Sequence, residues 1–105
     1  IVPLLFCSTR SVSGAFMVAR RYILKGRVQG VGFRYFTYAI AQDLGIKGWV
    51  KNLRNGDVEV HAEGDESSMK QFLTRIKSGP SLAFVQHIEV RDVEPDQYRD
   101  FTIEF

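Results

Sequence analysis

The chain has 105 residues, 45% of them hydrophobic and 25% charged, which is the composition of one ordinary globular domain. Lys and Arg number 14 against 12 Asp and Glu, and the net charge of +2 is too even for a broad nucleic-acid-binding surface. The single cysteine, Cys7, excludes a disulfide framework and favours a cytoplasmic location, and no apolar run is long enough to span a membrane.

Residues 1–16 differ from the rest of the chain. An apolar run, Ile1–Cys7, precedes a stretch rich in Ser and Gly. No basic residue stands before the apolar run, as a secretory signal requires, whereas the Ser residues, Arg10 and the absence of acids are compatible with a transit peptide. Because the regular pattern begins only after Met17, we expect an upstream or vector-derived leader over 1–16 and one domain over 17–105.

The first half of the domain predicts a strand, a loop, a helix and a second strand. The first strand covers Arg20–Val28, and the helix covers Phe33–Leu44 and ends at Gly45. The apolar stripe of this helix is expected to consist of Phe36, Ile40 and Leu44. A second strand is predicted over Ile46–Asn52.

The second half begins with Asn55-Gly56, which predicts a hairpin with a type I′ turn because both residues tolerate positive φ. The strand that follows alternates, with Val58, Val60 and Ala62 inward and Glu59, His61 and Glu63 outward. A second helix starts after the N-cap Asp65 and stops at Gly79-Pro80. Its apolar face is Met69, Phe72, Leu73 and Ile76. The last two strands cover about 84–93 and the alternating Phe101, Ile103 and Phe105.

This order, βαββαβ plus a terminal strand, predicts an α+β ferredoxin-like sandwich. We expect an antiparallel sheet of four to five strands with two helices on one face. The fold class alone predicts no function, because it supports many chemistries.

The loop before the first helix is the main candidate site. Gly30 and Gly32 let the backbone turn so that successive N–H groups point at one place, and the helix adds its unpaired N–H groups and positive dipole end. Such a loop predicts a phosphate site. Arg34 stands in the first helical turn, where a cation opposes the dipole. A phosphate ligand would explain it, and extension into solvent is the alternative.

Comparison with other phosphate loops narrows the chemistry. The loop lacks the Gly-Lys-Ser/Thr ending that would hold Mg²⁺, and Tyr35 stands where a dinucleotide fingerprint has its third glycine. Val28 occupies the position of the nucleophilic cysteine in cysteine phosphatases. Neither His61 nor His87 lies near the loop in sequence. If the site performs phosphoryl chemistry, we expect water to be the attacking group and no metal to be bound.

Asn52, at the end of the second strand, is a further candidate. Asparagines near hairpins are commonly turn residues. Here, however, Asn55-Gly56 already supplies the turn. A carboxamide can donate to a phosphoryl oxygen and accept from a water at the same time, so Asn52 is suited to positioning a nucleophile.

Two segments, Gly26–Arg34 and Gly48–Glu59, resemble the two signature motifs of acylphosphatases, and the similarity extends from about Arg21 to Phe105. The resemblance implies hydrolysis of the carboxyl–phosphate bond of small acyl phosphates, without metal or cofactor. Arg34 then matches the arginine that binds the phosphoryl group, and Asn52 matches the asparagine that orients the attacking water. The residues matching the loop whose amides hold the phosphate oxygens are Gln29, Gly30, Val31, Gly32 and Phe33.

The resemblance implies a small acyl phosphate substrate, with inorganic phosphate as product or inhibitor. We expect a monomer that binds neither nucleic acid nor membrane. The physiological acyl phosphate is not identified, because the motifs address only the phosphate.

Two alternatives remain open. The segment Gln29–Phe36 superficially resembles the aromatic RNP1 motif of RNA-binding modules, but it mismatches at Gln29, Val31 and Arg34 and opens a helix rather than forming a strand. The other alternative is an anion-binding domain without turnover, as in acylphosphatase-like domains of larger carbamoyl-transfer proteins.

Overall fold

The predicted order of elements is confirmed in the computed structural model, which describes residues 17–105. The elements are β1 (Met17–Arg27), α3 (Phe33–Leu44), β2 (Lys47–Asn52), β3 (Val58–Asp65), α4 (Glu66–Ser78), β4 (Phe84–Val93) and β5 (Phe101–Glu104). The leader expected over 1–16 lies outside the described residues. In the part of the chain that is described, neither helix has the length and apolar character needed to cross a membrane.

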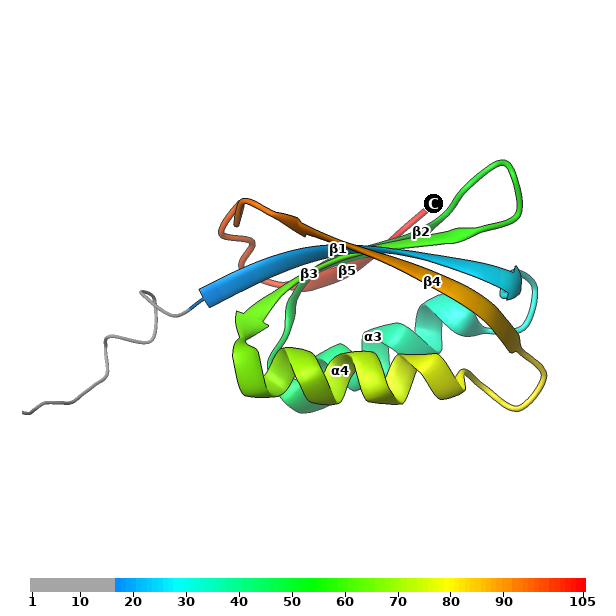
Figure 1. The fold of residues 1–105 in the computed structure, drawn as a ribbon, viewed down its shortest axis with the longest axis horizontal. Coiled ribbons are helices and arrows are strands. Elements are labelled where there is room, and N and C mark those ends of the chain that lie inside the picture. Colours follow the sequence, from blue (N-terminus) through cyan, green and yellow to red (C-terminus); the bar gives the residue numbers. More distant parts are fainter. Residues whose placement is uncertain (1–16) are drawn as a thin grey trace, which may run out of the picture.

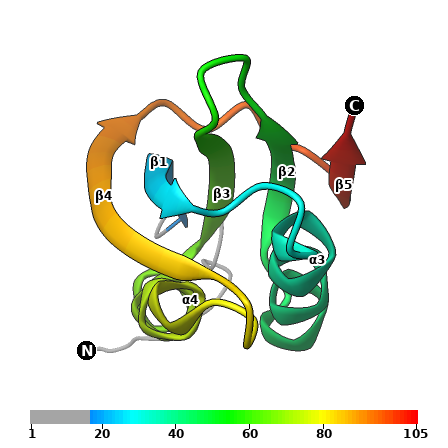
Figure 2. The ribbon, with the colours of Figure 1, turned by 90° about the vertical axis from the view of Figure 1, so that its right-hand side faces the viewer.

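One five-stranded sheet, in the order β4-β1-β3-β2-β5, has both helices on the same face, as Figures 1 and 2 show. The four strands from β4 to β2 are antiparallel as expected. β5 is parallel to β2, so the prediction of an antiparallel sheet is wrong for this edge. The cause is the connection after β4, which returns the chain at the same end of the sheet. β5 must therefore run opposite to β4, and β2 already has that direction.

The core lies between the sheet and the two helices. On α4, Met69, Phe72 and Ile76 are buried, and the predicted N-cap Asp65 accepts a hydrogen bond from the backbone N–H of Ser68. On α3 the predicted stripe is only partly right. Ile40 is buried, but Phe36 and Leu44 pack at the margin of the core. The buried residues of α3 are Phe33, Thr37, Ile40 and Ala41.

The hairpin between β2 and β3 is confirmed, but its turn type is not. Within residues 17–105 Gln97 is the only non-glycine residue with positive φ, so Asn55 does not adopt the type I′ conformation. Instead, Gly56 N–H donates to Leu53 O, and only Gly56 has positive φ. This is a longer loop built on an ordinary turn and closed by a glycine. The reason is the Asn55 side chain, whose Oδ1 accepts from the backbone N–H of Asp57 and fixes a different local geometry.

Candidate active site

A pocket of about 280 Å³ lies where the β1–α3 loop, the end of β2 and the end of β5 meet. Figures 1 and 2 show these segments gathered at one end of the molecule. The walls of the pocket include Arg34 and Asn52, the two residues predicted to act on a phosphoryl group. The pocket is lined by Val28, Gly30, Gly32, Phe33, Arg34, Tyr35, Asn52, Ile103 and Phe105.

The loop itself has the conformation that its glycines predict. Gly30 and Gly32 have φ of 74° and 78°, in the left-handed region. Gly32 is the N-cap of α3, which has no side-chain cap and no acidic residue in its first turn. Among the described residues, the N–H groups of Gly30, Val31 and Gly32 have no backbone acceptor. The loop and the helix start therefore have unpaired donors and a positive dipole end beside the pocket.

Arg34 is held against the pocket wall by β5. Its Nη1 donates to the backbone oxygen of Glu104 at 3.0 Å, and its Cζ lies 4.7 Å from the centre of the Phe105 ring. A guanidinium has five N–H donors, so the bond to Glu104 leaves most of them for a ligand. The arginine is thus positioned by neutral groups while its fork can still bind an anion.

Asn52 reaches the pocket because of its place in β2. It is the last residue of the strand, opposite Val58 of β3. Side chains alternate along a strand, so Asn52 shares a face with the buried Val50, which is the face toward the helices. The end of β2 therefore places the carboxamide beside the start of α3.

Gln29 is used differently from the other loop residues. Its side-chain Nε2 donates to the backbone oxygens of Leu53, at 2.6 Å, and Asp57, at 2.7 Å. These bonds join the β1–α3 loop to the hairpin that follows Asn52. Any contact of Gln29 with phosphate would therefore be made by its backbone N–H. Neither Gln29 nor Val31 lines the pocket, and Val31 packs against the core.

Asp57 keeps the base of this hairpin in place. Lys25 Nζ donates to Asp57 Oδ2 at 2.8 Å, and Asn55 Nδ2 donates to the same oxygen at 3.1 Å. The hydrogen bond to Asp57 raises the pKa of Lys25, so the lysine remains charged. The Lys25–Asp57 bond thus joins β1 to the hairpin just before the β1–α3 loop, and Gln29 joins the loop itself to the hairpin.

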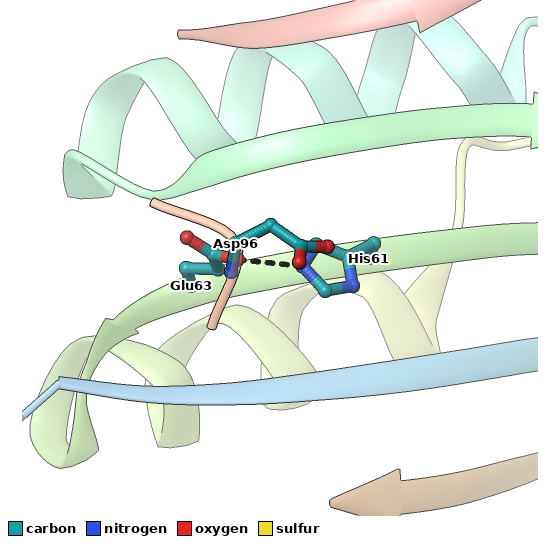
Figure 3. Close-up of side chains that lie close together, drawn as sticks. All are labelled: His61, Glu63 and Asp96. Carbon is teal, nitrogen blue, oxygen red and sulfur yellow. Dashed lines mark hydrogen bonds and ion pairs between the residues drawn. The ribbon is translucent and has the colours of Figure 1, made fainter. Parts of the chain in front are cut away.

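A second polar cluster lies on the opposite face of the sheet, and the sequence did not predict its burial. His61 and Glu63 point outward from β3 as expected, yet both are fully buried. Figure 3 shows the β4–β5 connection, which carries Asp96, crossing over them. Trp49 stacks on the His61 ring and donates a hydrogen bond from Nε1 to the hydroxyl of Tyr98.

The ligand atoms of His61, Glu63 and Asp96 lie within 4.8 Å of one another, a set that could suit a metal ion. Their hydrogen bonds indicate another role. Arg21 Nε donates to His61 Nδ1, so the ring proton is on Nε2 and is donated to Glu63 Oε2 at 2.7 Å. The backbone N–H groups of Asp96 and Tyr98 also donate to the Glu63 carboxylate, at 2.6 and 3.2 Å.

Glu63 therefore fastens the β4–β5 connection to β3. Burial alone raises the pKa of Glu63, but the hydrogen bonds from His61 and from the backbone of Asp96 and Tyr98 outweigh it, so the pKa is lowered overall. The signal in the sequence was two ionisable residues two positions apart on one strand face. Nothing local indicated that a distant connection would cover them.

Four residues of the pocket were not predicted as site residues: Val28, Tyr35, Ile103 and Phe105. The alternation of Phe101, Ile103 and Phe105 predicted a shared face. Phe101 is indeed buried, but Phe105 lies beyond β5 and is fully exposed. Which edge of the sheet β5 would join could not be read from this local pattern.

The segment Gln29–Phe36 covers a loop and the first turn of α3. RNP1 belongs to a strand in the middle of a sheet, so this geometry removes the support for an RNA-binding module.

Comparison with known proteins agrees with the two motifs. The family model described as Acylphosphatase matches residues 20–103. An acylphosphatase of Thermotoga petrophila is 46% identical over 85% of this chain and 99% of its own length. The structure of an acylphosphatase from Bacillus subtilis matches with a TM-score of 0.82 and 38% identity, covering 84% of this chain and 99% of that one.

A structure of full-length HypF in a phosphate- and nucleotide-bound form also matches, with a TM-score of 0.78 and 38% identity. There the match covers 85% of this chain but 12% of that one, whereas the Thermotoga and Bacillus proteins are matched over nearly their whole length. The family model and these relatives agree with one another. The chain therefore belongs to the acylphosphatase family.

Proposed function

We propose that this chain hydrolyses acyl phosphates to a carboxylate and inorganic phosphate, with the phosphoryl group held at the β1–α3 loop. In this proposal Arg34 and the N–H groups of Gln29 to Phe33 bind the phosphoryl oxygens, and Asn52 orients the attacking water. The observation that carries it is the convergence of Arg34, Asn52 and the glycine loop on one pocket, from two segments far apart in sequence.

The reaction suits this set of groups. The water oxygen attacks phosphorus, the bond to the acyl oxygen breaks, and its electron pair leaves on the carboxylate. A carboxylate is a good leaving group and needs no general acid. The proton of the water passes to a phosphoryl oxygen. In the transition state charge spreads over the equatorial oxygens, which favours fixed donors such as Arg34 and the loop amides.

The pocket offers no ligands typical of Mg²⁺, because its lining residues include no Asp or Glu. We therefore expect turnover in the presence of excess chelator. The test is hydrolysis of benzoyl phosphate by the whole chain with EDTA present. The absence of turnover above the spontaneous rate would refute the proposal and favour an anion-binding domain without catalysis.

Two variants test the assigned roles. Arg34→Ala should lower kcat/KM by about 10²–10³-fold, because a fixed donor to the transition state is lost. Asn52→Ala should lower kcat while the inhibition constant of inorganic phosphate is retained, because the water rather than the anion loses its partner. The matched control is Arg75→Ala, which removes an exposed ion pair with Asp43 on the helices. Full activity in Asn52→Ala would contradict the water-positioning role.

The oligomeric state also belongs to this proposal. The pocket is complete within one chain, so we expect the enzyme to act as a monomer. Activity per chain that stays constant on dilution, with a monomer mass by light scattering, is the expected result.

A further inference from the structure

The two edges of the sheet differ in length. β5 has 4 residues, whereas β4, at the opposite edge, has 10 (Figure 2). Within residues 17–105, β4 pairs with β1 on one side and has no strand on the other. Proteins commonly protect such an edge by shortening it or by placing Pro or Lys on it, and β4 contains neither residue. The backbone N–H and C=O groups that point away from β1 can therefore pair with a further extended chain.

An apolar groove of about 370 Å³ runs beside this edge, between β4 and α4. Ile88 and Val90 lie opposite the fully buried Leu24 and Tyr22 of β1, so their side chains are on the helix side of the sheet. Ile88 is nevertheless only partly buried, and Val90 is 49% exposed. The core is thus incompletely covered along β4. The groove is lined by Leu73, Lys77, Val85, Gln86, His87, Ile88 and Val90.

The groove offers a positive charge to a ligand. Its lining residues include Lys77 and His87 but no Asp or Glu. No ion pair among residues 17–105 includes Lys77. Lys77 stands in the last turn of α4, where the helix dipole favours a cation, but the dipole does not occupy its N–H donors. An acidic side chain in the groove would therefore find a cation that no carboxylate holds.

The positions along the groove define the pattern of a partner. α4 is capped by Gly79, where a Cβ would lie 3.5 Å from Val85 Cγ2, and the chain then reverses into β4. Lys77 therefore lies toward the Val85 end of the groove, and Leu73, one helical turn earlier, lies toward Val90. Every second side chain of a strand shares a face. A strand antiparallel to β4 would thus fit the groove with the pattern apolar-x-apolar-x-acidic.

We propose that β4 is a docking edge for an extended peptide of this pattern, which adds to the sheet beside β4. Main-chain hydrogen bonds supply the affinity, and the groove with Lys77 selects the side chains. A second copy of the chain fits less well, because pairing through the same groove brings no acidic lining residue to Lys77. The groove and the phosphate pocket share no lining residue, so this docking edge does not depend on the proposed hydrolysis.

The test uses the whole chain and the probe acetyl-Thr-Val-Thr-Ile-Thr-Glu-Thr-amide, with binding followed by NMR amide shifts. We expect saturable binding that slows amide hydrogen exchange in β4 and leaves it unchanged in β5. The same peptide with Lys in place of Glu should bind at least about threefold more weakly. Two further versions carry N-methyl groups on alternate residues. Because only every second peptide N–H faces β4, one version should lose binding and the other should keep it.

Three variants test the groove. Lys77→Glu should reverse the preference, so that the Lys peptide binds more tightly than the Glu peptide. Lys70→Glu is the matched control and should keep the original order, because Lys70 is an exposed lysine of α4 that does not line the groove. Val90→Thr should weaken binding of the Glu peptide about three- to tenfold, since the exposed half of an apolar side chain is no longer available for burial.

Four results would overturn the proposal. They are no binding at millimolar peptide, equal binding of the Glu and Lys peptides, binding of both N-methylated versions, and slowed exchange confined to segments other than β4. A dimer mass by light scattering, with slowed exchange in β4 in the absence of peptide, would assign the edge to a second copy and overturn the proposal as well. Each of these results leaves the proposed hydrolysis intact, because that reaction is measured at the other pocket.

Discussion

Replacing Glu63 by Ala tests whether the buried bridge holds the β4–β5 connection in place. The substitution removes the acceptor for three donors: His61 Nε2–H and the backbone N–H groups of Asp96 and Tyr98. His61 is fully buried, so its donor loses its partner without access to water, at a cost of about 1–3 kcal/mol. Each backbone N–H adds about 0.5–1.5 kcal/mol, because water can reach the exposed connection.

The total is about 2–6 kcal/mol, a large part of the 5–15 kcal/mol by which domains are typically stable. Glu63→Gln should cost less, about 1–3 kcal/mol. Its single oxygen can replace either Oε1 or Oε2, but its NH₂ group then faces a donor at the other position. Glu59→Ala is the matched control, since Glu59 lies on the same strand face and, among the described residues, forms its ion pairs with the side chains of Arg21 and Lys51. Its loss should cost less than about 1 kcal/mol.

The assay is urea unfolding at pH 7, followed by Trp49 fluorescence and circular dichroism. Because the pKa of Glu63 is lowered in the folded state, its contribution is complete above the unfolded pKa of about 4.3. It is lost as pH falls through the folded pKa. The difference in the free energy of unfolding between the unmodified chain and Glu63→Ala should therefore become smaller as the pH falls. A Glu63→Ala cost no larger than that of Glu59→Ala would refute the reasoning, and so would a difference that stays constant down to pH 3.

Three further predictions concern single positions. Gln29→Ala should raise the activation free energy of turnover, obtained from the fall in kcat, by more than it lowers the free energy of unfolding, because it frees the loop from the hairpin. Unchanged kinetics would contradict this. Gly48→Ala should cost more than Gly45→Ala in urea unfolding: both have positive φ, worth about 1–2 kcal/mol, but only at Gly48 would a Cβ overlap the His61 backbone oxygen. Asp65→Ala should lower the free energy of unfolding by about 1 kcal/mol with activity retained, because only the α4 cap is lost.

The elements were predictable because local signals decided them. Asp65 and Gly79 mark the ends of α4, and Gly45 marks the end of α3, in the capping roles expected from their residue types. The bounds of α3 and β4 were confirmed to the residue. In each case the signal lies within a few positions of the boundary, so no long-range contact was needed to read it.

What could not be predicted depends on contacts between distant segments. The side chain of Gln29 finds its acceptors on the hairpin, and Glu63 finds two of its donors on the β4–β5 connection. Neither partner can be identified from spacing, because both follow from the order of strands in the sheet. The prediction of a type I′ turn at Asn55 was wrong for a different reason. Its side chain bonds Asp57 and overrides the positive-φ preference of the Asn-Gly pair.

The partners of Arg34 explain why this arginine suits an anion site. Arg20, Arg21 and Arg75 each form an ion pair with a carboxylate. Arg34 is held instead by the Glu104 backbone oxygen and the Phe105 ring. A carboxylate partner would compete with a bound phosphoryl group for the guanidinium, whereas a carbonyl and a ring position it and leave its net charge uncompensated. The parallel placement of β5 beside β2 supplies these neutral partners, so the edge strand that local sequence specified least positions the arginine proposed to bind phosphate.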